Sequence, residues 1–122
     1  MAKSILIVDD SLSMRQVVSM VLKGAGYDVV EAVDGQDALA QLNGRRVHLI
    51  LCDLNMPNLD GLSFARAAKQ LPAYKFVPIV MLTTEGAAAK KEEGRASGLK
   101  AWMTKPFTPD RLLETVAKLV MP

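Results

Sequence analysis

Carboxylates follow two separate apolar runs of this 122-residue chain. Asp9 and Asp10 come directly after the run 5–8, and Asp53 comes directly after the run 47–52. Neighbouring carboxylates repel each other, and burying them together is unfavourable unless a cation lies between them. Oxygen ligands without a nearby His or Cys favour a hard cation, and Mg²⁺ is usually held by one or two carboxylates together with water and phosphate oxygens. The pattern therefore predicts a magnesium-dependent site for a phosphoryl group.

Phosphoryl transfer to a carboxylate is the chemistry that these residues could perform. An aspartate can attack phosphorus to form an acyl phosphate, while a metal ion offsets the repulsion between the two anions. We expect Asp53 to lie deepest in the site and to be the nucleophile, with Asp9 and Asp10 as the metal pair. Thr83 and Lys105 follow later apolar runs, and their hydroxyl and ammonium groups suit the remaining phosphoryl oxygens.

Five apolar or mixed runs predict the strands that position these side chains. Continuous runs are typical of strands covered on both faces, and mixed runs are typical of sheet edges. The continuous runs are 5–8, 47–52 and 77–82, and the mixed runs are 28–32 and 101–104. Helical periodicity lies between and after them, in 14–25, 36–42, 62–71, 86–97 and 108–120.

This alternation predicts one α/β domain over residues 1–122. The expected fold is a flavodoxin-like, doubly wound (βα)5 arrangement with a five-stranded parallel sheet in the order 2-1-3-4-5. Ligands of such sheets bind beyond the carboxyl ends of the strands, where the strand order reverses between strands one and three. The acidic residues are expected at that point.

The first and last helices carry the clearest local signals. Ser13 is the expected N-cap of the first helix and Gly26 its stop. Thr108 and Pro109 begin the last helix. The expected core-facing residues of the first helix are Met14, Val17, Val18, Met20, Val21, Leu22 and Ala25. The helix over 86–97 should be the least firmly held, because Gly94 interrupts it and its apolar face is thin.

Composition excludes several classes of protein. The formal net charge of +2 does not call for nucleic acid or an anionic membrane, and no apolar run approaches the roughly 18 residues that span a bilayer. Cys52 is the only cysteine and is expected to be buried and structural, which suits a reducing, cytoplasmic compartment. His48 is expected to be structural, and Lys90, Lys91 and Arg95 to form a solvated face or to meet an acidic partner.

The motifs together resemble those of the response-regulator receiver domains of two-component systems. They are Val8-Asp9-Asp10, Asp53 with Asn55-Met56-Pro57 and Asp60-Gly61, Leu82-Thr83-Thr84-Glu85, and Lys105-Pro106-Phe107. The resemblance spans nearly the whole chain. It is greatest to the stand-alone chemotaxis CheY class, because no output domain accompanies the motifs.

The resemblance implies a role for each matching residue. Asp53 would accept phosphate from a histidine kinase, Asp10 would bind Mg²⁺ directly, and Asp9 would bind it largely through water. The backbone carbonyl of Asn55 would be a further metal ligand. Thr83 and Lys105 would bind the phosphoryl group, and the Lys105–Pro106 peptide is expected to be cis.

Four positions are expected to tune the switch. Asn55 and Glu85 would govern the access of water to the phosphoryl group, which predicts faster self-dephosphorylation than in transcriptional regulators. Thr84 stands where a smaller residue is common and would narrow the entrance. Trp102 stands where the family usually has Tyr or Phe, and it would either pack on an edge strand or anchor a partner, since full inward rotation of an indole is doubtful.

The expected function is a signalling switch in which phosphorylation changes the surface formed by the fourth helix, the fifth strand and the fifth helix. The expected partners are a CheA-like kinase, a flagellar motor switch protein or another effector, and a phosphatase, with no nucleic acid and no membrane insertion. The protein would be a monomer that helps its own phosphorylation without being an enzyme. A phosphate sink or a regulator of another pathway are the alternatives. A dehalogenase-like phosphatase is less favoured, because it needs another Asp two residues after its nucleophile, and Ser11 and Leu12 follow the acidic pair here. A flavodoxin-like electron carrier is also less favoured, because its loop after the first strand should contain no acidic residue.

Overall fold

The fold is known from a computed structural model, which describes residues 2–54, 56, 59–83 and 101–121. Five strands form one parallel sheet in the order β2-β1-β3-β4-β5. They are β1 (Ser4–Val8), β2 (Asp28–Ala32), β3 (Leu49–Asp53), β4 (Ile79–Thr83) and β5 (Ala101–Thr104). The predicted doubly wound sheet and its strand order are confirmed.

Burial explains why the strand sequences differ. All five residues of β3 and of β4 are buried, as are four of the five in β1. The edge strands β2 and β5 each bury only one residue fully. Interior strands are covered by helices on both faces and so need continuous apolar sequence, whereas edge strands tolerate polar residues. Cys52 is fully buried in β3, as expected.

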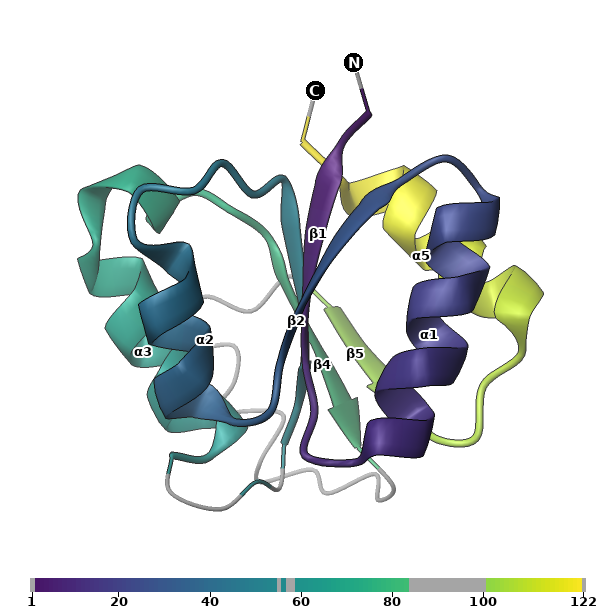
Figure 1. Ribbon diagram of the computed structural model, residues 1–122, viewed down its shortest axis with the longest axis horizontal. Helices are drawn as coiled ribbons and strands as arrows, with labels where there is room; N and C mark the ends of the chain where they lie inside the picture. The colour runs from purple at the N-terminus through teal and green to yellow at the C-terminus, as the bar shows by residue number, and fades with distance from the viewer. Residues whose placement is uncertain (1, 55, 57–58, 84–100, 122) are drawn as a thin grey trace.

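Helices cover both faces of the sheet (Figure 1). The described helices are α1 (Leu12–Gly24), α2 (Gly35–Leu42), α3 (Gly61–Gln70), the short 3₁₀ helix η1 (Pro72–Tyr74) and α5 (Pro109–Leu119). Figure 1 shows α1 and α5 on one face and α2 and α3 on the other. Two apolar clusters, one on each face, make up the core. The helix expected over 86–97, with Lys90, Lys91 and Arg95, lies outside the described residues.

Ser11 is the N-cap of α1, so the expectation that Ser13 caps this helix is wrong. The Ser11 hydroxyl accepts a hydrogen bond from the Met14 N–H at 3.3 Å, and the Ser11 carbonyl accepts one from the Arg15 N–H at 3.0 Å. Two serines two residues apart offer the same capping chemistry, and only the direction of the chain leaving β1 selects between them. The stop is as expected, because Gly26 has a left-handed backbone (φ 94°) just after the C-cap. Thr108 caps α5 as predicted, accepting from the Arg111 N–H at 3.1 Å.

The apolar face of α1 is narrower than the sequence suggests. Val18 and Leu22 are fully buried, whereas the side chains of Val17 and Met20 are 55% and 71% exposed. Each residue turns the helix by about 100°, so a stripe centred on Val18 and Leu22 leaves these two outside it. Val17, Met20 and the exposed C-cap Ala25 are therefore corrections to the expected core. No helix among the described residues has the length and apolar character to span a membrane.

Candidate functional site

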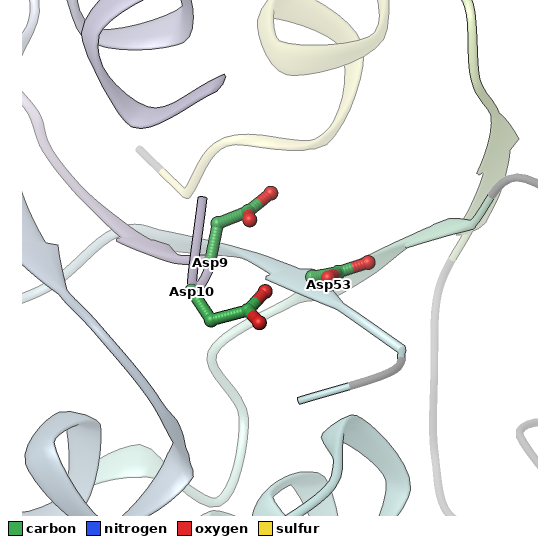
Figure 2. A group of neighbouring side chains, drawn as sticks. All are labelled: Asp9, Asp10 and Asp53. Carbon is green, nitrogen blue, oxygen red and sulfur yellow. The ribbon is translucent and has the colours of Figure 1, made fainter. Parts of the chain in front are cut away.

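The acidic residues meet where β1 and β3 end, at the point where the strand order reverses. Val8, the last residue of β1, pairs with Cys52, so Asp9 and Asp53 leave adjacent strands at the same level. Figure 2 shows Asp9, Asp10 and Asp53 gathered at this edge of the sheet. One carboxylate oxygen from each residue lies within 4.8 Å of the others. The predicted convergence of three carboxylates is therefore present.

Asp9 lies deeper than Asp53, so the expectation that Asp53 is the deepest carboxylate is wrong. Asp9 is 1% exposed, Asp53 is 9% exposed, and Asp10 is exposed. Asp9 continues the sheet beyond β1, because its N–H donates to the carbonyl of Ala32 at 3.1 Å. Its Oδ1 accepts a hydrogen bond from the Ser11 N–H at 2.8 Å. The exposure of the three acids thus increases from Asp9, which is buried and hydrogen-bonded, through Asp53 to Asp10.

Lys105 connects two of the carboxylates. Its Nζ lies 3.2 Å from Asp9 Oδ2 and 3.4 Å from Asp53 Oδ1, and its side chain is 13% exposed. The Lys105 N–H donates to the carbonyl of Thr83 at 2.6 Å, which fixes the lysine beside the end of β4. The Lys105–Pro106 peptide is cis, as the family resemblance implied. Charge-assisted contacts of this kind are strong in a partly buried site.

Ionisation of Asp53 is less favourable in the folded protein than in a free aspartate. Burial raises the pKa of Asp53 above 3.8, and the nearby charges of Asp9 and Asp10 raise it further. The Lys105 ammonium acts in the opposite direction. Three carboxylates lie beside one lysine, so the cluster carries more negative charge than that lysine offsets, which is the environment that favours binding of a divalent ion.

The remaining predicted site residues are Thr83, Trp102, Asn55, Thr84 and Glu85. Thr83 ends β4, is 1% exposed and pairs with Thr104 in the register of the sheet. Asn55, Thr84 and Glu85 lie outside the described residues. Trp102 is half-buried on the edge strand β5, against the apolar cluster that α2 and α3 cover. Its Nε1 is buried and has no hydrogen-bond partner among the described residues.

Residues outside the expected site turn out to support it. Arg15 donates from Nη1 to the carbonyl oxygen of Asp9 at 2.7 Å. Gly61 begins α3 directly beneath Asp53, and a Cβ at Gly61 would collide with the Asp53 carbonyl oxygen and lie 2.8 Å from Met81 Sδ. The Asp60-Gly61 pair was a signal for this position. No sequence signal marked Arg15, because its contact depends on how the helix folds back over the strand.

Comparison with known proteins agrees with this geometry. Residues 5–117 match the response regulator receiver domain. The crystal structure of the Vibrio cholerae chemotaxis protein CheY4 has a TM-score of 0.95 and 45% identity, covering 98% of this chain and 100% of that one. Chemotaxis protein CheY1 of Helicobacter pylori is 36% identical over 112 residues, 90% of each chain. The receiver domain of a Pseudomonas aeruginosa sensor histidine kinase, which has a magnesium ion coordinated in its active-site cleft, has a TM-score of 0.89 and 28% identity over 98% of each chain.

The chain belongs to the receiver-domain family of two-component response regulators. Members of this family are phosphoacceptor switches that take phosphate from histidine kinases and bind Mg²⁺ in an acidic pocket. Within the family, this chain is similar to CheY-type chemotaxis regulators.

Proposed function

We propose that Asp53 accepts a phosphoryl group from a histidine kinase in a magnesium-dependent reaction, and that the protein signals through the resulting change in its surface. The observation that carries the proposal is the meeting of Asp9, Asp10 and Asp53 within 4.8 Å, with the Lys105 ammonium between two of them. A buried nucleophile, a set of oxygen ligands and a fixed cation are the parts that phosphoryl transfer requires.

The donor set fits Mg²⁺. The cluster offers carboxylate oxygens alone, with neither His nor Cys in the group. Asp10 suits a direct ligand, because no hydrogen bond or ion pair occupies its carboxylate within the described ranges. Both oxygens of Asp9 already have partners, which suits a contact through water. Asp53 and the backbone carbonyl of Asn55, which lies outside the described residues, would complete the protein ligands.

Each side chain has a definite task in the transfer. A carboxylate oxygen of Asp53 attacks phosphorus, the bond from phosphorus to the imidazole nitrogen of the donor breaks, and its electron pair stays on that nitrogen. Lys105 exchanges its contact with Asp53 Oδ1 for a contact with a phosphoryl oxygen. The Thr83 hydroxyl donates a hydrogen bond to a second phosphoryl oxygen. Bound Mg²⁺ supplies the positive charge that lets two anions approach. Asp53 becomes a mixed anhydride.

A separate protein would bind the surface that phosphorylation changes. The surface that changes comprises the segment 86–97, β5 and α5, with Trp102 on β5 and with Thr84, Asn55 and Glu85 tuning the reaction. Similarity to CheY-type regulators supports a chemotaxis role, with a CheA-like donor, a flagellar motor switch protein as target and a phosphatase as a further partner. A phosphate sink and a regulator of another pathway are the alternatives.

We further propose that residues 1–122 form one domain, and that the protein is a cytoplasmic monomer. A single buried, unpaired thiol is in keeping with a reducing compartment. Membership of the receiver family favours a switch over a phosphatase enzyme or an electron carrier.

Acetyl phosphate provides the test of the proposal. Incubation with acetyl phosphate and Mg²⁺ should add the mass of one phosphoryl group to the intact protein, and chelation of the metal should prevent it. Asp53→Asn should abolish the addition. The matched control is Asp28→Asn, because Asp28 is an exposed aspartate at the opposite edge of the sheet. Modification of Asp53→Asn to the wild-type extent would exclude Asp53 as the acceptor.

Binding partners separate a messenger from a sink. A messenger should bind a motor switch protein more tightly when a phosphoryl mimic occupies the site, whereas a sink should drain phosphate from a shared kinase without such binding. Affinity measured with and without the mimic decides between them.

A further inference from the structure

Arg15 and Glu31 form an ion pair beside the acidic cluster. Arg15 lies one turn into α1, and its Nε is 3.3 Å from Oε1 of Glu31 on β2. The same guanidinium donates from Nη1 to the carbonyl oxygen of Asp9 at 2.7 Å. The Arg15 side chain is 11% exposed and that of Glu31 is 37% exposed. One planar group therefore connects a helix and an edge strand to the backbone that leaves β1.

Asp10 is the carboxylate that most needs this connection. Asp9 is fixed by Ser11 and Lys105, and Asp53 is fixed by its place in β3 and by Lys105. In the part of the chain that the structure describes, no hydrogen bond or ion pair fixes the Asp10 side chain, and that residue is exposed. Its position is therefore set by its backbone.

The Asp9 carbonyl belongs to the peptide group that joins Asp9 to Asp10. That group is planar, so a donor that fixes the oxygen also fixes the plane from which Asp10 departs. Glu31 contacts the guanidinium through Nε and offsets part of its charge, which lowers the repulsion between this cation and a metal ion in the cluster.

We propose that Arg15 and Glu31 are positioning residues that hold the Asp9–Asp10 peptide so that the Asp10 carboxylate can bind a divalent cation. This inference rests on the proposed magnesium site. It differs from a purely electrostatic effect, in which Arg15 would weaken metal binding by its positive charge, and from a purely structural role, in which stability would change but metal affinity would not.

The double variant Arg15→Gln/Glu31→Gln separates these effects, because it removes both charges and leaves the net charge unchanged. We expect its Mg²⁺ affinity, measured by calorimetry without any phosphodonor, to fall by about 10-fold, the lower end of the range for groups that orient metal ligands. Phosphorylation by acetyl phosphate should be weak at low Mg²⁺ and should recover at saturating Mg²⁺. A purely structural role would not give this split.

Arg15→Lys tests the geometry with the charge retained. A lysine has one ammonium and cannot reproduce the planar fork that meets both Glu31 and the Asp9 carbonyl, so we expect affinity between those of the wild type and the double variant. This variant decides the matter if the double variant does not fold. Lys23→Gln, an exposed basic residue at the end of α1, is the control and should bind Mg²⁺ as the wild type does.

The outcomes distinguish the inference from the function on which it rests. Wild-type affinity in both the double variant and Arg15→Lys, with normal Mg²⁺ binding by the wild type, overturns the positioning role alone. Tighter Mg²⁺ binding by the double variant also overturns it. A wild-type protein that binds no Mg²⁺ overturns the proposed function and this inference together.

Discussion

Asp53 carries a carboxylate that the fold makes costly to ionise. Burial and two neighbouring carboxylates raise its pKa above 3.8, so the folded protein holds this proton more tightly than the unfolded chain does. Ionising Asp53 therefore lowers the free energy of unfolding as the pH rises from 3.8 through the folded-state pKa of Asp53. The proposed cation would offset this penalty when it binds.

We predict that Asp53→Asn stabilises the metal-free protein at neutral pH. The amide removes one of three clustered negative charges, and Lys105 keeps its contact with Asp9 at 3.2 Å. The melting temperature in EDTA should rise by a few degrees, as expected for about 1 kcal/mol in a domain of this size. The gain should shrink as the pH falls through the folded-state pKa of Asp53 to below 3.8, where Asp53 becomes protonated in both states. Asp28→Asn is the control, and a gain independent of pH would contradict the charge explanation.

The start of α3 sets the position of the β3 end. Asp60 caps the helix by accepting from the Ser63 N–H at 2.8 Å, and the Gly61 N–H donates to the Leu54 carbonyl at 2.9 Å. This brings the helix backbone so close to Asp53 that no Cβ fits at Gly61. The first residue of α3 therefore has to be a glycine, because any Cβ there would collide with β3.

We predict that Gly61→Ala lowers the free energy of unfolding by about 1–3 kcal/mol, the usual cost of overpacking. It should also slow phosphorylation, because the methyl group pushes against the carbonyl of Asp53. Gly24→Ala is the matched control, since a Cβ there meets nothing within 4 Å and alanine favours a helix by up to about 1 kcal/mol. Chemical denaturation of both variants measures the difference; equal stability of the two would show that the close contact at Gly61 is unimportant.

The edge strand β5 leads directly to Lys105 in the site. Trp102 pairs with Met81 in the register of the sheet and lies three residues before Lys105. We predict that acetyl phosphate with Mg²⁺ changes the fluorescence intensity of this tryptophan, because its buried N–H, unpaired within the described residues, is sensitive to any shift of the strand. Asp53→Asn should show no change. Constant emission in a protein shown by mass to be phosphorylated would remove Trp102 from the switch.

The N-cap and the buried face of α1 could not be predicted from the sequence. Ser11 and Ser13 offer the same cap, and the apolar residues of α1 fit more than one stripe, so tertiary packing had to select Ser11 and to leave Met20 in solvent. The start of α5 had no competing cap, and the prediction that Thr108 caps it and Pro109 follows is confirmed.

Over the whole molecule, the sheet is the part most fully predictable from sequence. Interior strands require continuous apolar runs and edge strands do not, so burial leaves few strand orders, of which 2-1-3-4-5 is the common doubly wound one. That order places the strand ends that carry Asp9 and Asp53 side by side. The relative depth of the two acids was not predictable, because it depends on hydrogen bonds from Ser11 and Lys105. The role of Arg15 was not predictable either, because its contacts with Asp9 and Glu31 depend on how α1 packs against β1 and β2.

The account depends on one ion being held between acids from two strand ends. Mn²⁺ binds to the same oxygen ligands as Mg²⁺ and is visible by anomalous X-ray scattering. A crystal of the protein soaked in Mn²⁺ should give one anomalous peak at the cluster, in direct contact with carboxylate oxygens of Asp10 and Asp53. A peak elsewhere, or three carboxylates without an ion at saturating Mn²⁺, would contradict it.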